Sequence, residues 1–155
     1  MLKTLQKYIE IDCLADLTLE EFIKYSRVLS GKVRDRATHV INECERVRLA
    51  VQAMKTGNME FLGKLLNKSH ESLSKLYEVT GRELDALAYA AQEHPACAGS
   101  RMTGGGFGGC TISLVKTAEV EDFKNVVLEK YERATGYRAE CYKADVSDGI
   151  TVEKL

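Results

Sequence analysis

One stretch of this chain has a composition that points to chemistry, the segment from Ser100 to Val115. Five of the six residues from 104 to 109 are glycine, and the sixth is Phe107. Each glycine that is held in a single conformation costs roughly 0.5 to 1 kcal/mol relative to alanine. Such a cluster is expected where a ligand must approach the bare backbone, most simply a phosphate group bound by main-chain N–H groups.

Three well-known phosphate-binding loops do not fit this segment. Gly104, Gly106 and Gly109 satisfy G-x-G-x-x-G, but a dinucleotide-binding loop continues into a helix, whereas the β-branched residues of 110–115 predict a strand. A protein-kinase loop lies between two strands, yet the chain contains neither H-R-D nor D-F-G. The P-loop pattern G-x-x-x-x-G-K-[ST] is also missing from the sequence.

Two interpretations of the loop remain open from the residues alone. In one, residues 104–109 form a hairpin whose bare backbone permits tight helix-sheet packing, with Phe107 as a hydrophobic plug. In the other, the loop faces a ligand. We favour the second, because Gly-Gly-Gly-Phe-Gly-Gly is more flexible than a turn requires.

The loop must be positioned by the elements around it, and the residues before the single proline, Pro95, show helical periodicity. Capping boxes of Thr18 with Glu21 and of Thr80 with Glu83 indicate two helix starts, and Asn58 indicates a third. We predict helices over residues 2–10, 18–30, 32–56, 58–76 and 80–94, with the third and fourth packed as an antiparallel hairpin.

After Pro95 the pattern changes to short β-rich runs. We predict strands over 98–103, 110–115, 137–144 and 150–153, a helix from Thr117 to Gly136, and a turn at 147–149. The predicted fold is therefore α+β, a single domain over 1–155 with helices first and a small, mainly antiparallel sheet of about four strands. The first thirty residues are compatible with a remnant of an interdomain region.

Composition excludes several classes of partner. The 22 basic and 23 acidic residues are scattered and give a net charge of −1, which disfavours nucleic acid and anionic membranes. Five cysteines without a C-x-x-C pair predict reduced thiols in a cytoplasm. The sequence contains no run of about 18 apolar residues, the length that could cross a bilayer. His39, His70 and His94 are too far apart for a helical zinc pair, so no metal site is expected.

The segment from Ser100 to Thr111 closely resembles the third signature motif of galactokinases, which belong to the GHMP superfamily of small-molecule kinases. The resemblance covers nearly the whole chain and implies the fold of a GHMP-kinase C-terminal domain. Its other parts are Arg36–Val40, Ser69–Leu73, Tyr77–Val79, Glu83–Asp85 and Ser147–Gly149.

The resemblance implies the C-terminal half of an enzyme that transfers the γ-phosphate of MgATP to the 1-hydroxyl group of galactose. The family's sugar-binding motif, its ATP-phosphate loop and its catalytic aspartate and arginine belong to the other half, which would also contribute most of the ATP and Mg²⁺ binding. We therefore expect no catalytic residue and no metal ligand in this chain, and no activity from it alone. The residues expected to line the site are Arg101, Thr103, Gly104, Gly105, Gly106, Phe107, Gly108 and Gly109.

Two segments differ from the family pattern. Residues 74–76 read Ser-Lys-Leu where Arg-Asp-Asp is common, and Ile150-Thr151 replaces a small residue and arginine. Galactose and N-acetylgalactosamine both remain open as the sugar. His70 and Tyr77 could face that sugar or hold two helices together.

The alternative function is a non-catalytic, sugar-kinase-like binding or interaction module. An exposed apolar face would then favour self-association.

Overall fold

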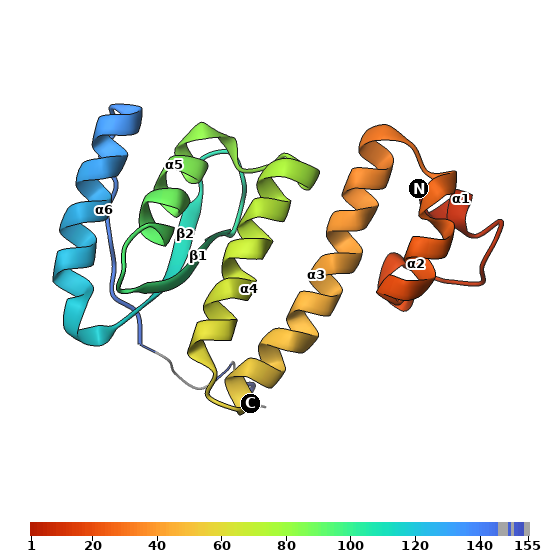
Figure 1. Cartoon of the computed structure of the whole chain (residues 1–155), viewed down its shortest axis with the longest axis horizontal. Helices are drawn as coiled ribbons and strands as arrows, with labels where there is room; N and C mark the ends of the chain where they lie inside the picture. The colour runs from red at the N-terminus through yellow and green to blue at the C-terminus, as the bar shows by residue number, and fades with distance from the viewer. Residues whose placement is uncertain (146–148, 150, 154–155) are drawn as a thin grey trace.

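The computed structural model describes residues 1–145, 149 and 151–153. Its elements follow one another across the molecule, from short N-terminal helices through two long helices to a two-stranded hairpin flanked by two more helices (Figure 1). The two long helices are α3 (Gly31–Lys55) and α4 (Met59–Ser72), the helices that flank the hairpin are α5 (Gly81–Gln92) and α6 (Val120–Thr135), and the strands are β1 (Cys97–Thr103) and β2 (Cys110–Val115).

The first thirty residues form short helices that pack against the start of α3. The predicted capping box is present, since Glu21 N donates to Thr18 Oγ1 at 3.2 Å and Thr18 N donates to Glu21 Oε2 at 2.9 Å. These elements are α1 (Leu2–Leu5), η1 (Leu14–Asp16), α2 (Leu19–Tyr25) and η2 (Ser26–Val28). Their buried apolar residues share one cluster with two residues of α3, comprising Leu5, Ile11, Leu17, Phe22, Leu29, Ala37 and Ile41.

Helices α3 and α4 form the predicted antiparallel hairpin (Figure 1). Asn58 caps α4 as expected, because its side chain accepts a hydrogen bond from Phe61 N at 3.0 Å. Helix α4 continues into a single π-helical turn, η3 (Leu73–Tyr77), which ends at Glu78. Glu78 is left-handed, with φ of 61°, and its carboxylate is held by Lys32 of α3.

The capping box predicted at Thr80 is wrong. Thr80 has helical backbone angles (φ −83°, ψ −53°), and its side chain makes no capping hydrogen bond. A capping side chain reaches the N–H groups of the first turn when its own backbone is extended, and that geometry is missing here. Helix α5 begins at Gly81, whose φ of +79° reverses the chain.

The sheet is an antiparallel hairpin in which Ser100 pairs with Ser113 and Met102 with Thr111. Ser100 N donates to Asn67 Oδ1 at 2.8 Å and Ser100 O accepts from Gln92 Nε2 at 2.8 Å. Both backbone groups of Ser100 therefore point away from β2.

Met102, two residues further along β1, repeats this arrangement. Its N–H donates to His70 Nδ1 at 3.2 Å, and its C=O accepts from Arg101 Nε at 2.8 Å. Side chains of α4, α5 and Arg101 therefore occupy the edge of β1 where another strand would otherwise pair.

Helix α4 presents one face to that edge, with Gly63, Asn67 and His70 spaced four and three residues apart. A Cβ atom on Gly63 would lie 2.0 Å from Ala98 O, and one on Gly99 would lie 2.0 Å from Gly63 O. Two glycines thus allow helix and strand backbones to touch, which brings the longer side chains within hydrogen-bond reach of β1.

Helix α6 ends at Gly136, as predicted, with φ of 81°. Its predicted start is wrong, because Thr117–Glu119 forms a separate 3-10 turn, η4, and α6 begins at Val120 without a side-chain cap. The helix packs on α5 through Phe123 and Val127, which share a cluster with Ala90 and Ala91.

The prediction of about four strands is also wrong for the described residues, where the sheet has two strands. Residues 137–145 are not in a strand, and Tyr137 and Tyr142 are 62% and 80% exposed. The alternating pattern of 137–144 gives β-propensity, but a strand also needs a paired edge and a covered face. Residues 151–153 are not in a strand either. Residue 150 and the predicted turn at 147–148 lie outside the described residues.

We expect Gly63→Ala to destabilise the isolated chain by about 2 kcal/mol or more, because the added methyl group would meet the backbone of β1. Replacing glycine by alanine in a helix interior normally stabilises a protein by up to about 1 kcal/mol, so a loss of stability here would indicate the close contact with β1. Urea unfolding followed by circular dichroism measures it. Gly105→Ala is the matched control, since a Cβ atom there has no neighbour within 4 Å. Equal stability of Gly63→Ala and wild type would contradict the close contact.

Candidate functional site

The glycine loop, residues 104–109, forms the tip of the β1–β2 hairpin, and three of its residues have left-handed backbones. Their φ angles are 71° at Gly104, 62° at Phe107 and 119° at Gly108. At the two glycines this conformation has no steric cost, whereas at Phe107 it is strained. The loop backbone is therefore folded back on itself rather than extended.

Two further glycines of the loop are required by close packing. A Cβ atom on Gly106 would lie 2.0 Å from Val79 O, and one on Gly109 would lie 2.1 Å from Gly105 O. Phe107 N also donates to Val79 O at 3.0 Å, so the loop is docked on the segment between η3 and α5. Sequence reasoning did not identify Val79 as this docking point, because its contribution is a backbone carbonyl.

Gly105 is different from its neighbours. A Cβ atom there would meet nothing within 4 Å, and its φ lies outside the left-handed region. The fold alone would thus accept a side chain at this position. Nothing in the fold of the described residues therefore requires glycine at this position.

The plug interpretation of Phe107 is wrong, because its side chain is 76% exposed. The loop also leaves polar groups free: within the described part of the chain, the N–H groups of Gly105, Gly106 and Gly108 have no hydrogen-bond partner. Free backbone N–H groups next to left-handed residues can bind an anion. Thr103, the last residue of β1, is exposed beside them.

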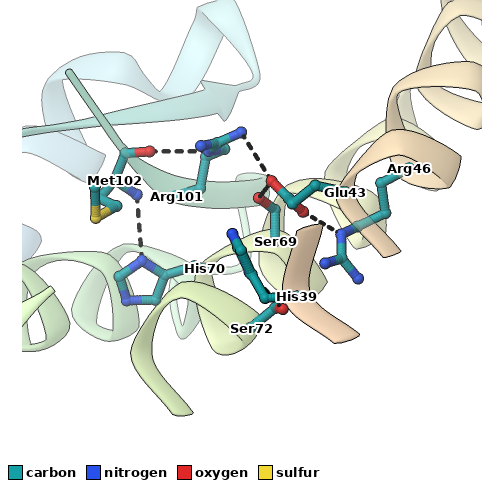
Figure 2. A network of polar contacts seen from close by, with 8 residues as sticks. All are labelled: His39, Glu43, Arg46, Ser69, His70, Ser72, Arg101 and Met102. Carbon is teal, nitrogen blue, oxygen red and sulfur yellow. Dashed lines mark hydrogen bonds and ion pairs between the residues drawn. The ribbon is translucent and has the colours of Figure 1, made fainter. Parts of the chain in front are cut away.

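Arg101, the charged residue nearest to the loop in sequence, is directed toward α3 (Figure 2). Its Nη1 lies 3.7 Å from Glu43 Oε2, which also accepts from Ser69 Oγ at 2.8 Å. Glu43 contacts Arg46 Nε as well. The structure therefore places Arg101 in a network that joins α3, α4 and β1, beside the loop rather than within it.

Glu43 is the centre of this network, and its charge is maintained there. Burial raises the pKa of Glu43, but hydrogen bonds from Ser69 and Arg46 and the charges of Arg46 and Arg101 outweigh that effect, so its pKa is lowered. Sequence reasoning missed Glu43 and Arg46, and it gave no role to Ser69, which lies in a segment that resembles galactokinases. The available signal was the polar pair at positions 43 and 46 on the α3 face that contacts α4.

His70 is fully buried and has a structural position (Figure 2). Its Nδ1 accepts the Met102 N–H, so the proton of the neutral ring is on Nε2, 3.2 Å from Asp85 Oδ1. Burial lowers the pKa of His70, and the Asp85 charge offsets this only in part. Of the two roles left open for His70, holding elements together fits its surroundings.

Tyr77 stacks on the ring of His39 at a centroid distance of 4.7 Å. His39 Nδ1 lies 2.8 Å from Ser72 Oγ, and burial lowers the pKa of its imidazole. Tyr77 thus joins η3 to α3, although 37% of its side chain is exposed.

Two hollows in the surface lie away from the loop. One of about 350 Å³ lies between α3 and α4 beside Arg46 and Ser72, and another of about 450 Å³ lies between α4 and α5 beside Asn67 and Gln92. No loop residue lines either, so the loop does not enclose a small molecule with these hollows. Over residues 1–145, 149 and 151–153, no three His, Cys, Asp or Glu side chains are grouped to hold a metal ion. No described helix is long and apolar enough to cross a membrane.

We expect the stability of the isolated chain to fall as the pH is lowered from 7 to 5, partly because of His70. Above the ordinary histidine pKa of 6.5, the ring is neutral in both the folded and the unfolded chain. Below it, the unfolded chain takes up the proton first, which favours unfolding. In urea titrations, His70→Asn should be less stable than wild type at pH 7 and should lose less stability between pH 7 and 5. An unchanged pH dependence in this variant would contradict the assignment.

A family model described as "GHMP kinases C terminal" matches residues 50–133, more than half of the chain. Among curated relatives, "Galactokinase" of Lactobacillus helveticus is 46% identical over 149 residues, which cover 96% of this chain and 38% of the relative. "Galactokinase" of Clostridium perfringens (strain 13 / Type A) is 47% identical over 152 residues, which cover 97% of this chain and 39% of the relative. The chain thus spans about two fifths of the length of the curated relatives it matches.

A solved structure has the same fold as this chain. The crystal structure of Lactococcus lactis galactokinase complexed with galactose matches with a TM-score of 0.86 and 42% sequence identity, over 88% of this chain and 36% of that chain. The helix-rich arrangement with its small antiparallel hairpin is therefore that of the C-terminal part of a protein of this kind.

Proposed function

Because this chain belongs to the GHMP kinase family, we propose that it acts as the C-terminal part of a galactokinase, which transfers the γ-phosphate of ATP to the 1-hydroxyl group of galactose. Identities of 46% and 47% to curated galactokinases over nearly the whole chain support this reaction. The galactose complex of the Lactococcus lactis enzyme supports galactose as the sugar.

The observation that carries the proposal is the bare backbone at Gly105. Packing or a left-handed backbone accounts for the glycines at 104, 106, 108 and 109, but neither accounts for Gly105. The neighbouring N–H groups are free to bind an anion, which fits the phosphate groups that a kinase must hold. The loop would thus form one wall of the active site, with Thr103 at its base.

The residues present fit ATP only in part and do not fit magnesium. Free loop N–H groups suit a phosphate oxygen, but no described cluster of carboxylates suits a divalent cation. We assign magnesium binding, the catalytic base and most of the nucleotide contacts to the part of the enzyme that this chain does not include. Phosphoryl transfer depends on positioning and charge stabilisation, and the loop of this chain contributes one wall to that positioning.

Arg101 has an indirect part in this arrangement. Its guanidinium bonds to the Met102 carbonyl and lies beside Glu43, and Met102 is two residues before the loop. We assign Arg101 as a positioning residue that fixes the loop relative to α3. The five free cysteines, of which Cys13, Cys110 and Cys141 are exposed, suit a reducing compartment, and we place the enzyme in the cytoplasm.

We expect Gly105→Val to lower kcat for galactose phosphorylation at least about tenfold, because its side chain would occupy the ligand's approach to the loop. The measurement uses a chimera in which this chain replaces the C-terminal part of Lactobacillus helveticus galactokinase. The melting temperature should change little, since the position is open.

Two glycine variants serve as controls. Gly106→Val should lower the melting temperature as well, because of the contact with Val79 O. Gly57→Ala, in the α3–α4 turn, should cost about 1 kcal/mol of stability through its positive φ and leave kcat unchanged. Wild-type turnover in the Gly105→Val chimera would reject the loop assignment.

We expect the isolated chain to show no galactose phosphorylation, and activity to appear when the separately expressed N-terminal part of the Lactobacillus helveticus enzyme is added. A coupled ADP-release assay with and without galactose measures both. Galactose-dependent ADP release by the isolated chain would contradict the assignment of the base and nucleotide contacts to the other part.

A further inference from the structure

We propose that the free edge of β2 binds an extended segment from the remaining part of the enzyme, which adds to the hairpin as its next strand. The inference rests on the proposed function for the identity of this partner. The binding site is the outer edge of residues 110–115, and recognition is by main-chain hydrogen bonds.

Only one edge of the hairpin is able to accept a strand. On β1, the outward N–H and C=O groups of Ser100 and Met102 are all bound by side chains at 2.8 to 3.2 Å. Two of these side chains, Asn67 and His70, belong to α4, which also contacts β1 through its backbone at Gly63. A strand could pair with β1 only by removing α4.

The outer edge of β2, in contrast, has backbone groups that are free to pair. Because Ser100 and Met102 point away from β2, their partners Ser113 and Thr111 point away from β1. Among the described residues, the backbone groups of Thr111 and Ser113 have no hydrogen-bond partner. The strand is also poorly covered, since Ile112 is 55% exposed and no residue of β2 is buried, although its sequence is typical of an interior strand.

An extended segment of the same enzyme fits this edge for two reasons. The relatives are about two and a half times as long as the matched region, so most of their length lies outside it. Residues 137–145 leave the end of α6 and, in the view of Figure 1, run back between α6 and β2. A strand added to β2 would offer its other edge to residues 137–144, whose alternating pattern predicts a strand that has no partner here.

The test compares amide hydrogen exchange in the isolated chain and in the Lactobacillus helveticus chimera. We expect the N–H groups of Thr111 and Ser113 to exchange at least tenfold more slowly in the chimera. The N–H groups of Ile112 and Leu114, which face β1, serve as internal controls and should be protected in both. Fast exchange at Thr111 and Ser113 in a folded chimera would overturn the proposal.

Paired substitutions at Thr111 test the main-chain contact directly. Thr111→Pro removes the outward N–H without touching the β1–β2 hydrogen bonds, and should weaken association of the isolated chain with the separate N-terminal part at least tenfold. Thr111→Val keeps the N–H and should associate like wild type. Unchanged Ile112 exchange in the proline variant confirms that the hairpin is intact, and equal association of the two variants would count against strand addition.

The outcomes separate this inference from the proposed function. If the β2 edge is protected in an inactive chimera, strand addition is supported and the kinase assignment is rejected. If the chimera is active but the β2 edge is unprotected, the kinase assignment is supported and strand addition is rejected. Protection that appears in the isolated chain on raising its concentration identifies a second copy as the occupant and overturns the choice of partner.

Discussion

The contact between α4 and the edge of β1 is the constraint on which the rest of this structure depends. Gly63 and Gly99 bring the two backbones together, and Asn67 and His70 then bind the N–H groups of Ser100 and Met102. An isolated two-stranded hairpin is marginal in water, and here a helix takes the place of the third strand. The glycine loop extends from the end of β1, the strand that this helix holds in place.

The glycines of the loop are required for two different physical reasons, which the composition of the loop does not distinguish. Gly106 and Gly109 are small because other backbone atoms lie close to them, and Gly104 and Gly108 are flexible because their φ angles are positive. Docking on Val79 fixes the loop relative to α5 and η3, while Arg101 and Glu43 fix β1 relative to α3. The loop is therefore rigidly supported at its base and open at its tip, which is the arrangement that a preorganised binding wall requires.

Local sequence signals predicted most of the helices and strands, and the errors arose where the structure depends on contacts between residues far apart in the sequence. The Thr18 box, the Asn58 cap and the strand over 110–115 depend on neighbouring residues, so they could be read from the sequence. The Thr80 cap failed because this residue is buried and has a helical backbone, neither of which the neighbouring sequence indicates. The strand over 137–144 failed because β-propensity alone does not make a segment pair, and these described residues form no hydrogen bond with the free edge of β2. The direction of Arg101 and the role of Val79 depend on contacts across the fold and leave no sequence pattern.

The blocked edge of β1 also limits how copies of this domain can aggregate. Growth of a β-fibril requires each molecule to offer two free edges, one for the copy before it and one for the copy after it. Within the described residues this hairpin has one, since side chains from α4 and α5 and Arg101 occupy the other. Two copies that paired through β2 would use up both of their free edges. Edge-to-edge pairing of strands therefore stops at a dimer. By blocking the edge of β1, helix α4 prevents growth into a β-fibril even when the edge of β2 is uncovered.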